Sequence, residues 1–293
     1  MLWLKREARR RCSRVARVPS DDQLLELDDG RTIGYATWGD SEGTPVFIGH
    51  GTPGSRLDRY PGLDDPLWVH RQRLRFVGVD RPGYGYSDPW PEASLLDCAG
   101  DFVRVADHLG LERFWALGVS RGAPYVIALG VLAPERVGRV ALVSGADVGM
   151  DEEETQEELV AELGEEARML RDAPDEWYAG FVAEVTEVDR RVLERPEVRA
   201  TTIEMFQEAV RQGAVSWVDD VVRLGRPWSF RLDEVVTDVR FHHGEEDANV
   251  PPEHVKEVAE RIPTSRLRLY PGDGHISILD RPIKEIVETL LAP

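Results

Sequence analysis

The sequence predicts an α/β protein built on a mostly parallel sheet with helices on both faces. Three features of the chain support this class: short apolar runs rich in valine, phenylalanine and isoleucine, glycine-rich turns that bound them, and helical stretches that separate them. Strands that are apolar throughout are typical of parallel sheets covered on both faces. Regular alternation of strands with helices indicates right-handed crossover connections.

The expected sheet begins with a hairpin, in which strands at Leu24–Leu27 and Thr32–Trp38 flank an Asp-Asp-Gly turn at Asp28–Gly30. His242 and His243 are adjacent at the end of a later strand. Because successive side chains of a strand point to opposite faces of the sheet, one of the two is expected to be buried. Apolar strands are then expected at Pro45–Ile48, Phe76–Val79, Phe114–Gly118 and Val140–Val143, and two further strands later in the chain at Val239–Phe241 and Arg266–Tyr270.

Helical patterns separate these strands, and one long helical segment interrupts the alternation. Between Asp147 and Leu232 strand-like runs are absent, and the segment holds 22 acidic residues and 10 arginines at helical spacing. Because strand patterns resume after it, we expect a helical insertion between two strands of the sheet. The other helices are expected at Ser94–Leu109, Ala123–Leu132, His254–Arg261 and Ile283–Leu291.

Charge and composition restrict the class of partner. The chain has 293 residues, 42% of them hydrophobic, and a formal charge of −18. An acidic surface repels phosphate backbones, which argues against nucleic-acid binding. No apolar run is long enough to cross a bilayer, so no stable membrane association is expected. Residues 1–17 carry a net charge of +6 without the apolar segment of a secretory signal, so a cytoplasmic location is expected.

The predicted organisation has three parts: a basic arm at 1–20, a sheet unit formed by 21–146 and 233–293, and a helical cap at 147–232. The two cysteines, Cys12 and Cys98, cannot form a disulfide framework. The sequence contains neither H-E-x-x-H nor a cluster of cysteine and histidine. We therefore expect no metal ion and no cofactor.

A candidate nucleophile stands in Gly118-Val119-Ser120-Arg121-Gly122, which matches G-x-S-x-G. This pattern is typical of a sharp strand-to-helix turn that lifts a serine hydroxyl clear of a sheet. A second match at Gly39–Gly43 joins one predicted strand to the next with no helix after it, so a polar turn is expected there. Only Ser120 has a strand before it and a helix after it, and we predict that Ser120 is the nucleophile.

A serine hydroxyl needs a neighbouring base to take its proton, and a carboxylate to orient that base. His275 lies in a glycine-bounded loop just after the last predicted strand and is the expected base. The other histidines are expected to be structural or on the surface, because they lie on predicted helices, within a strand or in the loop after a strand: His50, His70, His108, His242, His243 and His254.

The expected carboxylate is Asp247, in the tight turn that follows the strand at Val239–Phe241. Asp147, which follows the strand at Val140–Val143, is the competing candidate, because an acid there also lies at the carboxyl edge of the sheet. The order serine, aspartate, histidine along the chain is that of α/β hydrolases and differs from the order in chymotrypsin and subtilisin.

The reaction also needs donors directed at the oxygen on which negative charge develops. The backbone N–H of Arg121 follows the nucleophile at the start of a helix and is one expected donor. The other is expected from the loop His50–Ser55, where two glycines and a proline permit unusual backbone, and Thr52 N–H is the best candidate. His50 itself is expected to brace that loop.

The motifs together resemble the α/β-hydrolase superfamily, and the resemblance covers the chain from about Leu24 to its end. It rests on the loop at His50–Ser55, the elbow at Gly118–Gly122, and on Asp80–Gly85, Asp247 and Gly274-His275. It implies an eight-stranded, mostly parallel sheet with a helical cap over the site, and a structural loop at Asp80–Gly85. Epoxide hydrolases and haloalkane dehalogenases share the His-Gly-x-Pro form but use aspartate at the elbow, so Ser120 argues against those activities.

We therefore predict a serine hydrolase of carboxylesterase type that cleaves an ester, lactone or related acyl bond of a small molecule through an acyl-enzyme. Two alternatives stay open: an aminopeptidase or amidase similar to proline iminopeptidases, in which cap acids hold a free amine, and a non-catalytic ligand-binding protein. The chain lacks the Gly-Gly-Pro-Gly form of the iminopeptidases. Aromatic residues of the cap are candidates for the substrate pocket, foremost Trp177, Phe181, Phe206 and Trp217, and also Tyr178 and Trp228.

Overall fold

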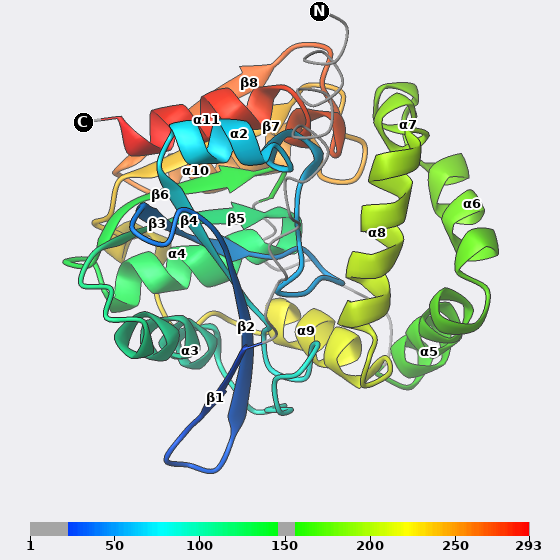
Figure 1. Ribbon diagram of the computed structural model, residues 1–293, viewed down its shortest axis with the longest axis horizontal. Helices are drawn as coiled ribbons and strands as arrows, with labels where there is room; N and C mark the ends of the chain where they lie inside the picture. Colours follow the sequence, from blue (N-terminus) through cyan, green and yellow to red (C-terminus); the bar gives the residue numbers. More distant parts are fainter. Residues whose placement is uncertain (1–22, 146–155, 293) are drawn as a thin grey trace, which may run out of the picture.

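Eight strands form one sheet at the centre of the molecule, with the helices packed around it (Figure 1). The structure is a computed structural model that describes residues 23–145 and 156–292. In space the strands follow the order β1-β2-β4-β3-β5-β6-β7-β8. Their bounds are Gln23–Glu26 (β1), Thr32–Gly39 (β2), Thr44–Gly49 (β3), Leu74–Val79 (β4), Phe114–Val119 (β5), Val137–Val143 (β6), Val239–Gly244 (β7) and Ser265–Tyr270 (β8).

The direction of the strands brings distant parts of the chain to one edge of the sheet. The first two pairs, β1 with β2 and β2 with β4, are antiparallel, and all the other neighbouring pairs are parallel. The predicted α/β fold with a mostly parallel eight-stranded sheet is therefore confirmed. Because parallel strands end at the same edge, the loops that follow β3, β5, β7 and β8 lie close together.

Helices cover both faces of the sheet, as its apolar strands require. The helices α3 (Leu95–His108), α4 (Ala123–Leu132) and α10 (Pro252–Glu260) share a core with one face, and α2 (Pro66–Arg71) and α11 (Pro282–Leu291) share a core with the other. Successive side chains of a strand enter opposite cores. In β3, for example, Phe47 packs with the first group of helices and Val46 with the second.

Both histidines at the end of β7 are buried, so the prediction that alternation buries only one of them was wrong. His243 is fully buried, and His242 is 6% exposed. The reason is that β7 lies between β6 and β8 inside a sheet covered on both faces, so each direction of the alternation leads into packed protein. His242 Nδ1 lies 3.0 Å from the Tyr270 hydroxyl.

Five α-helices of the described residues, here called the inserted helices, come between β6 and β7 and lie beside the sheet in Figure 1. They pack around an apolar core of their own that includes Leu163, Leu170 and Leu193. The segment 147–232 was predicted as a cap. Of this segment, Asp147 lies outside the described residues, as does the predicted basic arm at 1–20. The bounds of the inserted helices are Gln156–Asp172 (α5), Pro174–Glu184 (α6), Glu187–Leu193 (α7), Pro196–Ala209 (α8) and Val215–Gly225 (α9).

Candidate active site

Ser120 lies directly after β5, on a sharp turn into α4. Its φ of 51° places a non-glycine residue in the left-handed region, which is unfavourable and is tolerated where surrounding structure enforces it. A Cβ on Gly118 would collide with Val126, and one on Gly122 would collide with the backbone of Gly49. The two glycines of the motif therefore let β3, β5 and α4 approach one another around Ser120.

The structure brings Ser120, His275 and Asp247 together at the carboxyl edge of the sheet. Nε2 of His275 lies 3.1 Å from the Ser120 Oγ. On the other side of the ring, Nδ1 lies 2.9 Å from one carboxylate oxygen of Asp247 and 3.1 Å from the other. The serine follows β5, the aspartate follows β7 and the histidine follows β8. The competing acid, Asp147, lies outside the described residues.

The contacts of Asp247 determine which nitrogen of His275 carries a proton. An ionised carboxylate only accepts hydrogen bonds, so Nδ1 of His275 is the donor and Nε2 presents its lone pair to Ser120. Burial by itself would raise the pKa of Asp247, but the hydrogen bond from His275 and the N–H of Val250 outweigh it and lower that pKa. Asp247 is therefore a carboxylate at neutral pH.

The loop after β3 lies against Ser120. A Cβ added to Gly51 would lie 3.7 Å from the Cβ of Ser120. Within the loop, His50 Nε2 accepts the Arg81 N–H at 3.2 Å, so its Nδ1 is protonated and donates to the Gly51 carbonyl at 2.8 Å. Burial, together with the charge of Arg81, lowers the pKa of His50 well below its usual range. His50 is thus a neutral brace of this loop.

A buried ion-pair network under the same loop was missed from the sequence. Asp220 of α9 pairs with Arg81 at 2.5 Å, and neither side chain is exposed. Asp220 also accepts the Thr52 hydroxyl at 2.6 Å and pairs with Arg223 at 3.1 Å. Burial would raise the pKa of Asp220, but the charges of Arg81 and Arg223 outweigh it and lower that pKa. An inserted helix therefore fixes the loop that carries Thr52.

The sequence contains little that would have revealed this network. Arg81 belongs to the segment Asp80–Gly85, which was expected to be a structural loop, and Asp220 is one of many acids in the insertion. The one available signal is that α9 has a strongly apolar face in which an acid at Asp220 is out of place. That signal indicates a buried partner but does not name it.

A cavity of about 310 Å³ opens beside Ser120 and His275 and is lined by the inserted helices together with the loops that follow β3, β5, β7 and β8. Its wall includes all four aromatic residues that were expected foremost: Trp177, Phe181, Phe206 and Trp217. Trp177 stacks on Phe181 with ring centroids 5.3 Å apart, and Phe206 meets Trp177 edge-on at 5.2 Å. Thr52 is also on the wall. Tyr178 instead donates its hydroxyl to the Leu193 carbonyl, and Trp228 lines a different hollow.

Two carboxyl groups also line this cavity, and neither was predicted. Burial raises the pKa of Asp58 to about 7, although the N–H of Ser55 donates to it at 2.9 Å. Glu166 of α5 is half-buried, and burial raises its pKa against the effect of a hydrogen bond from Trp177. Within the described ranges, no group of three or more histidine, cysteine, aspartate or glutamate side chains is arranged to hold a metal ion.

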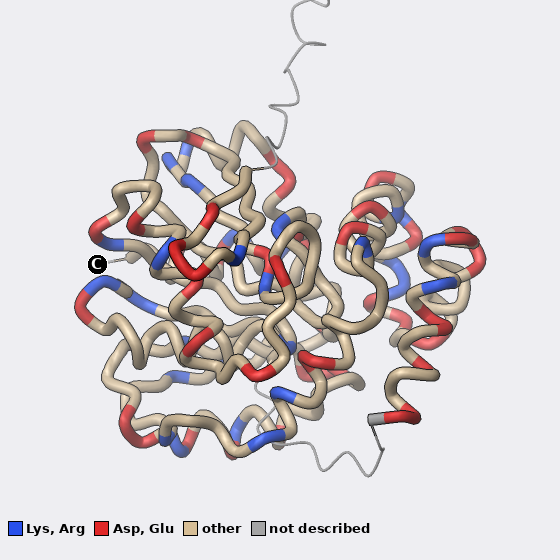
Figure 2. Tube along the Cα trace, turned by 90° about the horizontal axis from the view of Figure 1, so that it is seen from below, with Lys and Arg blue, Asp and Glu red and all other residues tan. Residues whose placement is uncertain are grey.

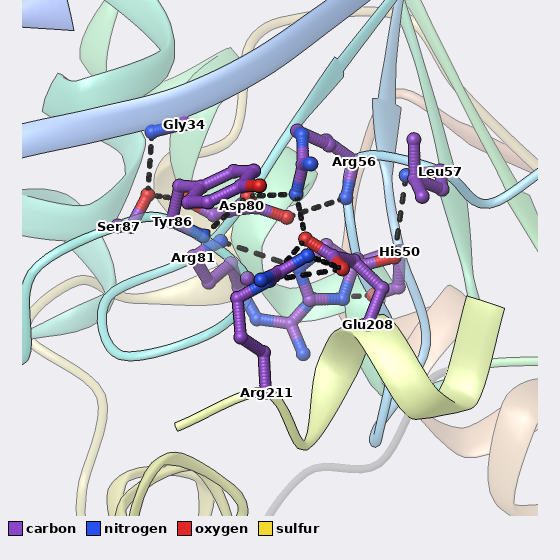
Figure 3. A network of polar contacts seen from close by, with 12 residues as sticks. Gly34, His50, Arg56, Leu57, Asp80, Arg81, Tyr86, Ser87, Glu208 and Arg211 are labelled. Carbon is purple, nitrogen blue, oxygen red and sulfur yellow. Dashed lines mark hydrogen bonds and ion pairs between the residues drawn. The ribbon is translucent and has the colours of Figure 1, made fainter. Parts of the chain in front are cut away.

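A second buried network joins α8 to the sheet (Figure 3). Arg56, in the loop after β3, lies between Asp80 at 2.9 Å and Glu208 of α8 at 2.6 Å. Glu208 in turn pairs with Arg211 at 2.7 Å. Burial raises the pKa of Asp80 to about 6 in spite of the Arg56 charge. Together with the network at Asp220, these ion pairs anchor the inserted helices next to the candidate site.

The order of the strands and the position of Ser120, His275 and Asp247 at their carboxyl edge are those of an α/β-type hydrolase. The family profile described as alpha/beta hydrolase fold matches residues 44–282, which is most of the chain. The protein therefore belongs to the α/β-hydrolase family, and the predicted resemblance is confirmed. Among the helices of the described residues, none combines the length and the apolar character that a bilayer-spanning segment needs.

Individual relatives differ in the activities that their names carry. A probable proline iminopeptidase of Streptomyces coelicolor is 32% identical over 210 residues, which cover 69% of this chain and 60% of that protein. The chain thus spans less than two thirds of the length of this relative. Two solved structures share the fold: an esterase of Thermogutta terrifontis (TM-score 0.67, 21% identity, 92% of this chain and 98% of that chain), and an enol-lactonase of Burkholderia xenovorans (TM-score 0.67, 18% identity, 92% and 99%).

Proposed function

We propose that this hydrolase cleaves an ester, lactone or related acyl bond of a small molecule through an acyl-enzyme on Ser120. The observation that carries the proposal is the continuous chain of contacts from Ser120 Oγ through the His275 ring to Asp247, at the wall of a cavity. A serine activated in this way attacks carbonyl carbon. The mainly apolar lining, with its aromatic and aliphatic side chains, favours an apolar acyl or alcohol group.

The proposed reaction has two steps that share one base. Ser120 Oγ attacks the carbonyl carbon while His275 Nε2 takes the hydroxyl proton, and the N–H groups of Thr52 and Arg121 stabilise the oxyanion. His275 then gives the proton to the leaving alcohol, and the acyl group remains on Ser120. Water attacks that ester with His275 again as base, and the acid leaves as Ser120 regains its proton. Asp247 keeps the His275 ring oriented throughout.

Replacing the serine tests this proposal. Ser120→Ala is expected to lower kcat on a p-nitrophenyl ester by about 10⁴-fold or more, because it removes the hydroxyl that lies 3.1 Å from His275 Nε2. Ser41→Ala is a matched control, since Ser41 stands in the second G-x-S-x-G but is exposed on a turn. Ester hydrolysis that survives in Ser120→Ala would contradict the proposal. Lack of fluorophosphonate labelling in the wild type would favour a ligand-binding protein instead.

An aminopeptidase or amidase is a second candidate, and one observation favours it specifically. Glu166 lines the cavity, so an acid of the inserted helices faces the space where a substrate would lie. A carboxylate in that position can pair with the free α-amine of a peptide or aminoacyl substrate. The iminopeptidase relative is consistent with this candidate, and the same three catalytic side chains would serve it.

Comparing two substrates in two variants separates the candidates. If the protein is an aminopeptidase, an aminoacyl anilide should be hydrolysed with a higher kcat/KM than its N-acetylated form. Glu166→Gln should then remove that preference, roughly tenfold in kcat/KM for one charge-assisted contact. The exposed neighbour Glu165→Gln is the control, because it lies on the same helix and does not line the cavity. Equal rates for both substrates would favour the esterase.

A further inference from the structure

The loop that carries His275 is bound by a carboxylate from the inserted helices. Asp189 of α7 is 2% exposed and accepts three successive backbone N–H groups. The distances are 3.0 Å from His275 N, 2.9 Å from Ile276 N and 2.8 Å from Ser277 N. Hydrogen bonds to an ionised acceptor are among the strongest in proteins, and three of them meet here on one side chain.

The contacts around Asp189 leave its carboxylate a single orientation. The Thr186 hydroxyl donates to it at 3.0 Å, from the position that caps α7. On the loop side, a Cβ on Gly274 would lie 2.6 Å from an Asp189 oxygen, so glycine is required for this close approach. The carbonyl of His275 is held from the opposite side, where the Ser144 hydroxyl donates to it at 3.0 Å. The peptide groups on both sides of His275 are thus fixed.

We propose that Asp189 is a positioning residue for the hydrolytic reaction, acting through the backbone of His275. This inference rests on the proposed function, in which His275 is the base. The imidazole must lie within hydrogen-bond reach of both Ser120 and Asp247, and its Cα is placed by the peptide groups that Asp189 and Ser144 bind. A displacement of about 1 Å at such a group can cost about 10²-fold in rate.

The consequence concerns the inserted helices as a whole. Helix α7 does more than cover the substrate cavity, because it supplies one of the contacts that hold the base. The inserted helices cannot move away at α7 without releasing the backbone of His275. Substrate that repositions α7 would therefore change catalytic efficiency as well as binding.

A second link between the same two segments provides a matched control. Arg195, at the start of α8, pairs with Asp280 at 2.8 Å, and both side chains are partly exposed. This ion pair also ties the inserted helices to the segment after His275, but it does not contact the His275 backbone. Asp280→Asn therefore weakens the attachment of the two segments while it leaves the contacts of Asp189 in place.

The test compares Asp189→Asn with Asp280→Asn. Asparagine replaces one of the two carboxylate oxygens by an NH₂ donor, so at least one of the three backbone N–H groups loses its acceptor. Asp189→Asn should therefore lower kcat by about 10- to 100-fold with KM within about twofold. The rate of fluorophosphonate labelling should fall in parallel. In proton NMR spectra, the downfield signal of the His275 Nδ1–H bound to Asp247 should weaken or move. Asp280→Asn should keep kcat and the labelling rate within about twofold of the wild type and leave the NMR signal in place.

Gly274→Ala keeps the carboxylate of Asp189 but adds a methyl group that pushes it away from the His275 loop. This variant tests the proposal if Asp189→Asn does not fold. A folded variant of either kind with an unchanged kcat and an unchanged NMR signal would overturn the proposal. Equal losses in Asp189→Asn and Asp280→Asn would also overturn it, because general attachment would then explain both. A wild type that no fluorophosphonate labels would refute the proposed function alone, since the NMR comparison reports the placement of His275 independently of hydrolysis.

Discussion

Asp58 shows how one buried side chain makes the stability of this protein depend on pH. It lies in the loop after β3, where the Ser55 N–H donates to it at 2.9 Å and the Tyr60 hydroxyl at 3.3 Å. Burial raises the pKa of Asp58 to about 7, and in the unfolded chain that pKa returns to about 4. Between about pH 4 and pH 7 the folded state binds more protons, so this residue lowers stability as pH rises.

Asp58→Asn removes this titration and nearly preserves the shape of the side chain. Its Tm, relative to the wild type, is therefore expected to increase from about pH 5 to about pH 7.5 and to level off above that. Thermal unfolding at several pH values measures the difference. Asp64→Asn, which removes an exposed acid from the same stretch of chain, is the control for the loss of a surface charge. A pH-independent difference for Asp58→Asn would refute the assignment of a buried, titrating carboxyl.

At the scale of single residues, the sequence predicts side chains whose positions depend on a local motif or on the end of a strand. It misses side chains whose positions depend on contacts with distant parts of the chain. Ser120 stands in a motif whose glycines create the turn, and His275 and Asp247 each follow a strand. Their meeting at one edge of the sheet could therefore be predicted from strand ends, although Asp147 also follows a strand and competed with Asp247. Asp189 and Asp220 lie on helices among many similar acids, and their partners are 86 and 139 residues away, respectively. Only the folded chain brings those pairs together.

Among the elements, α9 shows most directly how the inserted helices support the sheet unit. Asp220 lies between Arg81 and Arg223 and is completely buried. Without Asp220, the charges of Arg81 and Arg223 would lie in the protein interior with no opposite charge to compensate them. In addition, the Thr52 hydroxyl loses its acceptor, so the loop beside Ser120 is less well fixed.

Asp220→Ala is therefore expected to lower the free energy of unfolding by about 3–5 kcal/mol. Urea denaturation, followed by tryptophan fluorescence, measures this change. Asp219→Ala, one residue earlier and partly exposed, is the control and should change the free energy by about 0.5 kcal/mol or less. If both variants were equally stable, the network would contribute no more to folding than an ordinary surface acid.

The strands and the helices of the sheet unit were largely predictable because their apolar patterns are long and regular. The structure extends several strands by one to three residues; for example, β6 begins at Val137 where Val140 was expected. The bounds of helix α2 were not predicted, although His70 was expected to be a helix residue, because six residues make too few turns for a periodic pattern. The inserted helices were predicted as a group. Which of their faces meets the sheet depends on ion pairs, and these cannot be predicted from the periodicity of apolar residues.

For the whole molecule, the distribution of charge sets the response to salt. The formal charge of −18 includes +6 from residues 1–17, so the remainder of the chain carries −24. Acidic positions are spread over both the sheet unit and the inserted helices (Figure 2). Repulsion among exposed acids destabilises a compact chain and is screened by salt, whereas buried pairs such as Arg81–Asp220 are screened much less.

The Tm is therefore expected to rise as KCl increases from about 0.05 M to about 1 M, where the screening length falls to about 3 Å. Differential scanning calorimetry measures this trend. A sugar such as sucrose at equal osmolality separates screening of charge from general exclusion of solutes. A Tm that stays constant or falls with KCl would show that repulsion among surface acids does not limit stability.

The central claim is that Ser120 carries the acyl group during turnover, and mass spectrometry of the quenched reaction tests it most directly. The protein is mixed with a p-nitrophenyl ester, stopped in acid within the first turnovers and digested. We predict a mass increase of one acyl group on the peptide that contains Ser120, and none on the same peptide of Ser120→Ala. An acyl group on a different residue, or rapid hydrolysis by a chain that never becomes acylated, would contradict the account.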